Sequence, residues 1–247
     1  MKYGGNTACI ELRFENPERL IIIDAGSGIR QLGDYIVAND LPKGPIRAEI
    51  FLTHTHWDHI LGFPFFTPIY IPGTKLKVYG PSTFEEDSLA DVVGGQLVYR
   101  YFPVRQAELA SDIEYLDLKE DRLDLGDGIT VVTDPSYDEA MAREGEQVAA
   151  EQNQRIEEFM KNADFIVHDA QYTRGEYESS RLGWGHSTFE QTIAIAKRAG
   201  VKRMALFHHD PVRTDTQIEE FTAKYCDSAY TGDTEIFFAR ENAEIEI

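Results

Sequence analysis

The sequence predicts a layered α/β protein, and two observations support this class. Short apolar runs alternate along the chain with longer segments of helical periodicity, the pattern of strands that pack against helices. Several of these runs also end at a residue that can bind metal, and in layered α/β proteins sites gather where strand ends meet loops. These residues are Asp24, His54, the pair His168 and Asp169, and the pair His208 and His209.

The composition suits one globular domain over residues 1–247, or at most two small ones. Of these residues 42% are hydrophobic, enough for a full core, and the sequence contains no internal repeat or low-complexity linker. It has no apolar run of about 18 residues and no secretory pattern, so we expect a cytoplasmic protein that does not span a membrane. Cys9 and Cys226 are expected to be ordinary thiols rather than a disulfide framework.

The charge balance bears on possible partners. There are 24 Lys and Arg residues against 43 Asp and Glu residues, a net charge of −19. Phosphate-rich polymers are held mainly by Lys and Arg. The sequence therefore makes nucleic acid an unexpected partner and favours a small substrate.

The first half of the chain yields strands and helices in alternation. The run RLIIID is a buried strand that delivers Asp24 to a turn, and residues 29–40 have the spacing of an amphipathic helix. Residues 62–73 contain three prolines, which predicts a stiff loop that walls the substrate cleft or serves packing and a homodimer contact. The remaining expected elements are strands at 48–54 and 74–81 and a helix at 83–93 capped by Ser82 or Thr83.

The second half continues the alternation. Ser187 lies three residues before Glu190, which predicts a helix with a capping box that ends at Gly200. Apolar runs predict strands that end at Asp169 and at the pair His208 and His209. The other expected elements are a turn and strand at 124–133, a long polar helix at 144–162, a helix at 215–226 and a strand at 234–242.

The stretch LTHTHWDHILG places His54, His56, Asp58 and His59 within six positions. Imidazole and carboxylate together suit zinc, and also manganese or iron. Residues two apart on an extended segment point the same way, so His54 and His56 can grip one ion. Asp58 and His59 follow where the chain turns and are better placed for a second ion. The cluster therefore predicts two divalent metal ions, with zinc the first choice.

This motif and several others resemble a known family. THTHWDHILG is similar to the HxHxDH motif of the metallo-β-lactamase superfamily. The segments IIIDAGSGIRQLG, ADFIVHDAQYT, GWGHST and LFHHDP resemble the branch that contains ribonuclease Z-like enzymes and class II cyclic-nucleotide phosphodiesterase-like hydrolases. The resemblance runs through most of the chain and implies a four-layer αββα sandwich with the metals at one edge of two facing sheets.

The resemblance also implies roles for individual residues. By motif position, His54 and His56 are ligands of the first metal, and Asp58 and His59 are ligands of the second, with Asp58 also steering the water nucleophile. His208 resembles the family's last histidine ligand. The resemblance further makes Asp24 a supporting partner of the histidine loop and pairs Asp169 with His186 as a proton-donating couple. His168 is expected to be a core or supporting residue, and His209 a neighbour of the site.

Two features of the family are absent or uncertain here. The family has a third histidine for the first metal, but this sequence has no histidine between His59 and His168. The bridging aspartate of the family corresponds to Asp134, in a context that fits only partly. Either a metal-bearing hairpin is missing near residues 133–134, or the protein binds one metal or binds weakly.

These observations leave several functions open. The first is a hydrolase that cleaves a small phosphodiester, such as a cyclic nucleotide, with a metal-activated hydroxide, while His186 protonates the leaving oxygen. The second is a catalytically weak binding or sensory module on the same fold, and a ribonuclease Z-like RNA hydrolase is a further alternative. β-Lactam hydrolysis is the least favoured because the sequence has no export signal.

Overall fold

The computed structural model describes residues 2–81, 88–118, 122–132, 154–182 and 184–247. The chain divides into two compact units, and each is described here by itself. One consists of residues 6–135, which we call the histidine-loop unit because it contains His54, His56 and His59. The other consists of residues 1–5 and 136–247, which we call the acid-pair unit because it contains Asp169 and His186.

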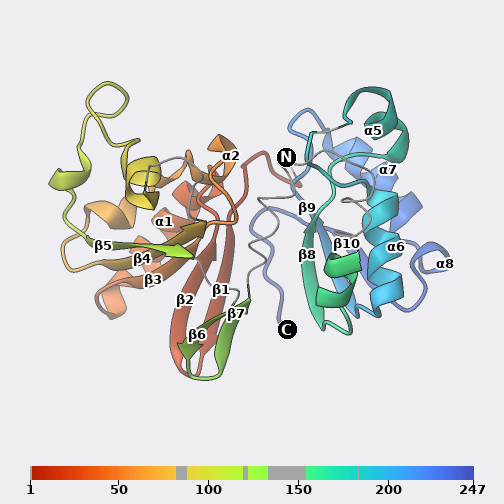
Figure 1. Cartoon of the computed structure of the whole chain (residues 1–247), viewed down its shortest axis with the longest axis horizontal. Helices are drawn as coiled ribbons and strands as arrows, with labels where there is room; N and C mark the ends of the chain where they lie inside the picture. The colour runs from red at the N-terminus through yellow and green to blue at the C-terminus, as the bar shows by residue number, and fades with distance from the viewer. Residues whose placement is uncertain (1, 82–87, 119–121, 133–153, 183) are drawn as a thin grey trace. The chain divides into compact units, whose positions relative to one another are not determined.

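The histidine-loop unit is built on a five-stranded sheet with the order β1-β2-β3-β4-β5. Strands β1 and β2 form an antiparallel hairpin, and β2 to β5 run parallel. Figure 1 draws this sheet from red to yellow-green, with helix α1 beside it. The strands are β1 (Ile10–Glu15), β2 (Glu18–Ile23), β3 (Arg47–Phe51), β4 (Lys75–Pro81) and β5 (Asp112–Leu118).

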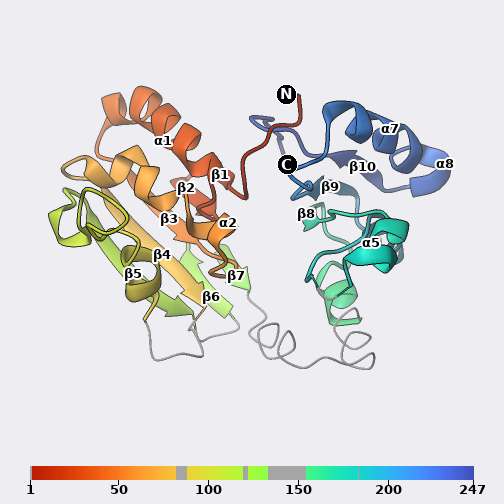
Figure 2. The same cartoon turned by 90° about the horizontal axis from the view of Figure 1, so that it is seen from above.

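The two faces of this sheet are covered by different elements. Successive residues on a strand face opposite sides. Ile22, Ile50 and Val78 are fully buried in the larger core, to which α1 (Gly28–Asn39) contributes. On the other face, Phe51 stacks on Tyr79 at 4.5 Å, and apolar side chains of the antiparallel pair β6–β7 join them. Figure 2 shows α1 and β6–β7 on opposite sides of the sheet. Strand β6 is Arg122–Gly126 and β7 is Ile129–Val132.

Short helical turns connect these strands. Residues 62–73 were expected to form a stiff loop, and they contain two 3₁₀ turns, η2 (Phe63–Phe65) and η3 (Thr67–Tyr70), each with proline near its start. Phe63, Phe66 and Ile69 are buried, so this segment packs into the core of its own unit. The other turns are η1 (Leu41–Lys43), α2 (Trp57–Ile60), the π-helical η4 (Ala90–Gly94) and η5 (Gln106–Glu108).

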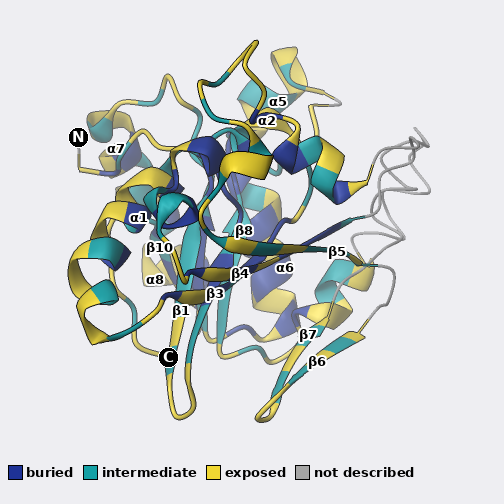
Figure 3. Cartoon of the chain, turned by 90° about the vertical axis from the view of Figure 1, so that its left-hand side faces the viewer, coloured by how far each residue is buried: buried dark blue, intermediate teal, exposed yellow. Residues whose placement is uncertain are grey.

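The acid-pair unit has a parallel three-stranded sheet with the order β10-β9-β8. Met204 and Leu206 of β9 are buried in a core shared with α6 and α7, and Figure 3 shows both dark blue and yellow segments along α6, as expected of an amphipathic helix. The strands are β8 (Phe165–Asp169), β9 (Arg203–Phe207) and β10 (Glu235–Phe238). The helices are α5 (Arg174–Ser180), α6 (Phe189–Ala199), α7 (Asp215–Tyr225) and α8 (Ser228–Thr231).

The start of α6 corrects one expectation. Thr188, not Ser187, is the N-cap, because the Thr188 side chain accepts a hydrogen bond from the N–H of Gln191. The N–H of Ser187 instead donates to Asp169 at 2.7 Å, so Ser187 is held one residue before the helix. The predicted stop is confirmed, since Gly200 caps the C-terminus of α6 with φ +68°.

Most of the other expected elements are present, with shifted ends. The strand expected at 48–54 ends at Phe51, although the N–H of Leu52 still donates to the Tyr79 carbonyl of β4. The long helix expected at 144–162 is helical at 154–159, and its earlier part lies outside the described residues, as do the expected caps Ser82 and Thr83. Strands β1 and β5 and helix α5 were not anticipated from the sequence.

Two expectations about the chain as a whole can also be compared with the structure. Cys9 and Cys226 are both free thiols, as predicted. Among the helices that the structure describes, none combines the length and the apolar character needed to cross a bilayer.

Candidate functional site

The buried carboxylate of Asp24 organises the start of the histidine loop. Asp24 follows β2 in a left-handed conformation, φ +62°, which aspartate tolerates better than most residues. Its Oδ1 accepts hydrogen bonds from the N–H and hydroxyl of Thr53 at 2.8 and 3.0 Å, and its Oδ2 lies 2.8 Å from Nδ1 of His59. Asp24 is only 4% exposed, so these partners satisfy a carboxylate that water barely reaches.

Gly26 and Gly62 allow the backbone of the segment DAGSG to press against the histidine loop. The N–H of Ala25 donates to the His59 carbonyl at 2.7 Å, and the N–H of Gly62 donates to the Ala25 carbonyl at 2.9 Å. A Cβ on Gly62 would lie 2.0 Å from the carbonyl oxygen of Gly26, and a Cβ on Gly26 would lie 2.3 Å from the carbonyl oxygen of Asp58. Only glycine fits at this approach, which fixes the loop relative to the end of β2.

His54 and His56 lie close together, as the spacing predicted. Their ring centroids are 4.5 Å apart and nearly perpendicular, and the centroid of His59 lies 4.0 Å from that of His54. Nδ1 of His54 is 3.0 Å from the hydroxyl of Thr53. Burial, followed by the charges that His59 and His56 would carry, lowers the pKa of His54 to about 4. The ring is therefore neutral at pH 7, the form that binds metal.

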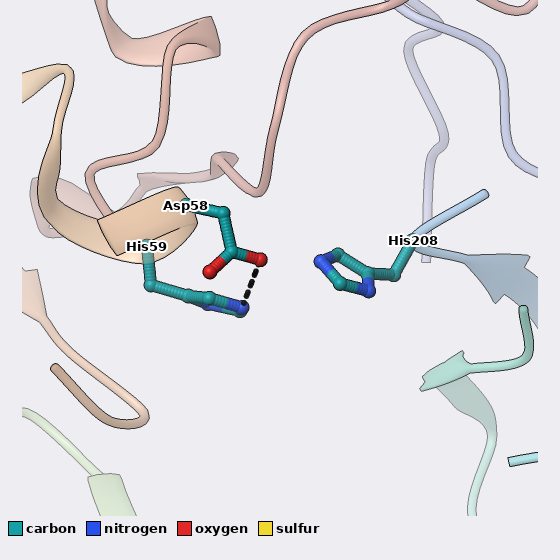
Figure 4. A group of neighbouring side chains, drawn as sticks. All are labelled: Asp58, His59 and His208. Atoms are coloured by element: carbon teal, nitrogen blue, oxygen red, sulfur yellow. Dashed lines mark ion pairs between the residues drawn. The ribbon is translucent and has the colours of Figure 1, made fainter. Parts of the chain in front are cut away.

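Asp58 and His59 belong to the helical turn α2, where the chain turns away from His56. Oδ2 of Asp58 lies 3.4 Å from Nε2 of His59, and Figure 4 draws this ion pair as a dashed line. Because Asp24 holds Nδ1 of His59, Nε2 is the nitrogen that points toward the Asp58 carboxylate. Two imidazoles whose Nδ1 atoms have partners, next to a third imidazole and a carboxylate, form a donor set that suits divalent metal ions.

In the acid-pair unit, Asp169 at the end of β8 is the centre of a second cluster. Its Oδ1 lies 3.2 Å from Nδ1 of His186 and 3.2 Å from Nδ1 of His208, and its Oδ2 accepts the N–H of Ser187. Burial alone would raise the pKa of Asp169, but the hydrogen bonds with His186, His208 and Ser187 outweigh it and hold the pKa at about 2. Asp169 is therefore an anion at neutral pH and accepts hydrogen bonds from both rings.

Gln171 fixes the backbone beside His208. Its side-chain nitrogen lies 3.3 Å from Nδ1 of His208 and 3.2 Å from the His208 carbonyl oxygen. Nδ1 cannot both donate to ionised Asp169 and accept from Gln171. We therefore assign the Gln171 hydrogen bond to the carbonyl, which is consistent with the left-handed backbone of His208 at φ +62°. The proton on Nδ1 leaves Nε2 of His208 as the nitrogen that would bind a metal.

The two neighbouring histidines have other contacts. Nδ1 of His168 lies 2.6 Å from the backbone oxygen of Asp169, and His168 pairs with Leu206 in the sheet. Nε2 of His209 donates to the Ala239 carbonyl at 2.9 Å, and its ring packs against the ring of Phe238. Burial lowers the pKa of His209 below its ordinary value. Both side chains thus contact the scaffold of the acid-pair unit.

The predicted site residues therefore form two groups, one in each unit. His54, His56, Asp58 and His59 gather in the histidine-loop unit, and ligand atoms of Asp169, His186 and His208 lie within 4.8 Å of one another in the acid-pair unit. That His208 binds the same metal site as the histidines of the loop stays a prediction. Asp134 and the possible missing hairpin at 133–134 lie outside the described residues.

Three supporting groups were not predicted from the sequence: the side chain of Thr53, the side chain of Gln171 and the backbone N–H of Ser187. Thr53 could have been found, because it directly precedes His54 at a strand end, where a hydroxyl can reach both neighbours. Gln171 acts on His208, which is 37 residues away, and the sequence carries no signal for that contact.

Comparison with known proteins supports the resemblance. Residues 3–77 match the sequence profile of the metallo-beta-lactamase superfamily. A protein named Ribonuclease Z from Shouchella clausii is 26% identical over 82% of this chain and 81% of its own length, and one from Ligilactobacillus salivarius is 23% identical over 82% and 80%. Ribonuclease Z from Thermoplasma volcanium is 34% identical, but only over 30% of this chain, which spans a quarter of that relative's length.

A solved structure supports the fold. The metallo-beta-lactamase fold protein YhfI from Bacillus subtilis aligns with 97% of this chain and 94% of its own, with a TM-score of 0.55 and 16% identity. This likeness confirms the predicted α/β fold class. Together, the profile match over residues 3–77, the curated relatives and this structure show that the chain is similar to proteins of the metallo-β-lactamase superfamily, among them Ribonuclease Z.

Proposed function

We propose that this protein is a metal-dependent hydrolase that cleaves a small phosphodiester. The observation that supports it best is that the Nδ1 atoms of two loop histidines each contact a polar side chain. Asp24 lies 2.8 Å from Nδ1 of His59, and Thr53 lies 3.0 Å from Nδ1 of His54. Such partners fix the tautomer and ring direction of metal-binding histidines in proteins.

His54 and His56 would hold one divalent ion, and Asp58 and His59 a second, with His208 and Asp134 as the further ligands that the family resemblance assigns. Zinc is the first expectation for this mixture of imidazole and carboxylate, with manganese or iron as alternatives. When bound, such ions lower the pKa of water and neutralise charge that develops on a phosphoryl oxygen.

His186 is the proposed proton donor to the leaving oxygen. Ionised Asp169 accepts a hydrogen bond from the Nδ1–H of His186 at 3.2 Å, which orients the ring. The proton on Nε2 can then pass to the leaving alkoxide. Asp169 holds the ring and does not itself exchange the proton.

The substrate is proposed to be small, for example a cyclic nucleotide. The net charge of −19 disfavours a long polyanion, because few cations are available to replace its counterions. We further propose that the two units are parts of one domain, and that the protein works in the cytoplasm, where its two thiols stay reduced.

The test measures metal content and turnover together. Purified protein is analysed for bound metal and assayed on bis-p-nitrophenyl phosphate and on 2′,3′- and 3′,5′-cyclic nucleotides, with His56→Ala as the variant. The hypothesis predicts close to two ions per chain and loss of both metal and turnover in the variant, with a far-UV circular dichroism spectrum like that of the wild type as the control for folding. Unchanged turnover in His56→Ala would reject the assignment.

RNA is the second candidate substrate. The curated relatives that match over most of their length are named Ribonuclease Z, which weakens the expectation that nucleic acid is no partner. Cleavage of a single-stranded RNA with a kcat/KM well above that for cyclic nucleotides would favour this candidate. If the purified protein binds almost no metal and cleaves neither substrate, the weak binding or sensory module becomes the better explanation.

A further inference from the structure

An uninterrupted row of rings and one guanidinium leads away from Asp169 in the acid-pair unit. The rings of His208 and His186 are stacked with centroids 5.0 Å apart, and the ring of Tyr172 meets His186 edge-on at 6.0 Å. The Arg181 guanidinium lies 5.7 Å from the centroid of Tyr172 and 4.5 Å from that of Trp184. The row thus runs from the proposed proton donor to an aromatic side chain at the surface.

The outer end of this row is exposed, and its inner end is fixed. Trp184 is 59% exposed although the Arg181 guanidinium lies over its ring. Tyr172 is only 4% exposed and forms a bridge with Thr188 at the start of α6. Trp184 lies two residues before His186 in the sequence.

The helix beneath the row is anchored firmly. Thr173 and Glu176 form a capping box at the start of α5, and Arg213 binds the Glu176 carboxylate through both of its terminal nitrogens, at 2.7 and 3.0 Å. Arg181 is the C-cap of α5, and the N–H of Trp184 donates to its carbonyl at 3.2 Å. The Arg181 guanidinium therefore extends from the end of a helix that its capping box and Arg213 hold in place.

We propose that Trp184 and Arg181 form a platform on which the base of a nucleotide substrate stacks. This inference rests on the proposed function, because it assigns a binding partner to the base of the phosphodiester whose leaving oxygen His186 would protonate. Bases stack on aromatic side chains and on arginine planes irrespective of sequence. The positive charge of Arg181 makes the indole face a better partner for an electron-rich, anionic ligand than an isolated tryptophan would be.

A nucleotide fits this platform better than an apolar ligand. A cation beside the aromatic face disfavours an aliphatic ligand, which gains nothing from the charge and has to dehydrate it. A nucleotide carries a flat ring and a phosphate, and so matches both the indole and the guanidinium. Trp184 is then a specificity-determining residue and Arg181 a positioning residue.

The test compares two ligands that differ by the base alone. Isothermal titration calorimetry gives the Kd of adenosine 5′-monophosphate and of ribose 5-phosphate for the purified protein and its variants. We expect the wild type to bind the nucleotide about tenfold more tightly or better. Trp184→Ala should reduce this ratio to near one, Trp184→Phe should retain most of it, and Arg181→Lys should reduce it in part because the planar stack is lost.

A matched control comes from the other unit. Tyr99 and Arg105 form an exposed pair of the same kind, with the guanidinium 4.2 Å from the ring, so Tyr99→Ala should leave the ratio unchanged. Equal affinities of the wild type for the two ligands, or an unchanged ratio in Trp184→Ala, would overturn the platform. Turnover of phosphodiesters without base preference would reject the platform and leave the hydrolase proposal intact. Base preference in binding without turnover would support the platform and reject the hydrolase proposal.

Discussion

Nδ1 of His59 lies 2.8 Å from Oδ2 of Asp24, two residues that are 35 positions apart in the sequence and both buried. The contact joins the end of β2 to the helical turn α2 and fixes which nitrogen of His59 points outward. A carboxylate behind a metal-binding histidine raises the basicity of the ligand and restricts its ring.

Asp24→Asn should therefore weaken metal binding by about 10- to 100-fold. The amide keeps the shape of the side chain, and asparagine also tolerates the left-handed backbone at this position, so folding should be preserved. Competition titration with a chelating indicator measures the affinity. Asp24→Ala is the contrasting variant, because it should also lower the melting temperature. Equal affinity in Asp24→Asn and wild type would show that the carboxylate does not act on a metal ligand.

His186→Ala should affect substrates according to their leaving group. A missing proton donor should lower kcat by about 10²- to 10⁴-fold for a substrate that expels an alkoxide. The effect on bis-p-nitrophenyl phosphate should be small, because nitrophenolate leaves without protonation. Asp169→Asn should show the same selectivity to a lesser degree, since the ring keeps a neutral partner. Equal losses on both substrates would mean that His186 has a different role.

Gly62→Ala should destabilise the histidine-loop unit by about 1–3 kcal/mol. The added methyl group would meet the Gly26 carbonyl oxygen at 2.0 Å, and backbone cannot move aside as a flexible side chain can. Thermal unfolding followed by circular dichroism provides the measurement. Gly175→Ala is the matched control: nothing lies within 4 Å of the position its methyl group would take, and alanine favours the helix, so the melting temperature should stay the same or rise. Equal behaviour of the two variants would refute the close approach.

The cap of α6 can be tested by two neighbouring variants. Thr188→Ala should lower the free energy of unfolding by about 1 kcal/mol, because the Gln191 N–H loses its side-chain partner. Ser187→Ala should cost the helix little, since only the backbone N–H of Ser187 contacts Asp169. Urea unfolding followed by Trp184 fluorescence in a Trp57→Phe background reports on the acid-pair unit. A larger effect for Ser187 would restore it as the cap.

The Glu176–Arg213 pair should make stability depend on pH. Burial would raise the pKa of Glu176, but the Arg213 hydrogen bonds and the Thr173 groups outweigh it and hold the pKa at about 2, below its ordinary 4.5. An acid whose pKa is lowered by folding stabilises the fold at pH values above its ordinary pKa. That contribution is lost as the pH falls toward 2.

Glu176→Gln is the variant that measures this effect. The free energy of unfolding of the wild type should exceed that of the variant by about 1 kcal/mol at pH 6. This value is modest because the Glu176 side chain is 40% exposed to solvent. The difference should shrink between pH 5 and pH 2, as followed by urea unfolding. A difference that stays constant over this range would show that the carboxylate charge does not contribute.

The sequence by itself determined most of the elements and the residue types of the candidate site. Apolar runs such as RLIIID specify strands, and His54, His56, Asp58 and His59 are close in sequence, so local geometry alone gathers them. The strand ends at Asp24, Asp169 and His208 were also foreseeable, because parallel strands deliver their last residues to one edge of their own sheet.

Tertiary structure decided which atoms these residues present. The contacts of Asp24 with His59, and of Gln171 with His208, join segments 35 and 37 residues apart, and a sequence gives no register for them. The tertiary contact with Asp169 also moved the cap of α6 from Ser187 to Thr188, since the Ser187 N–H is engaged there and the Thr188 hydroxyl caps the helix. The physical reason is that residue type fixes which hydrogen bonds a side chain can make, whereas packing fixes which of them it does make.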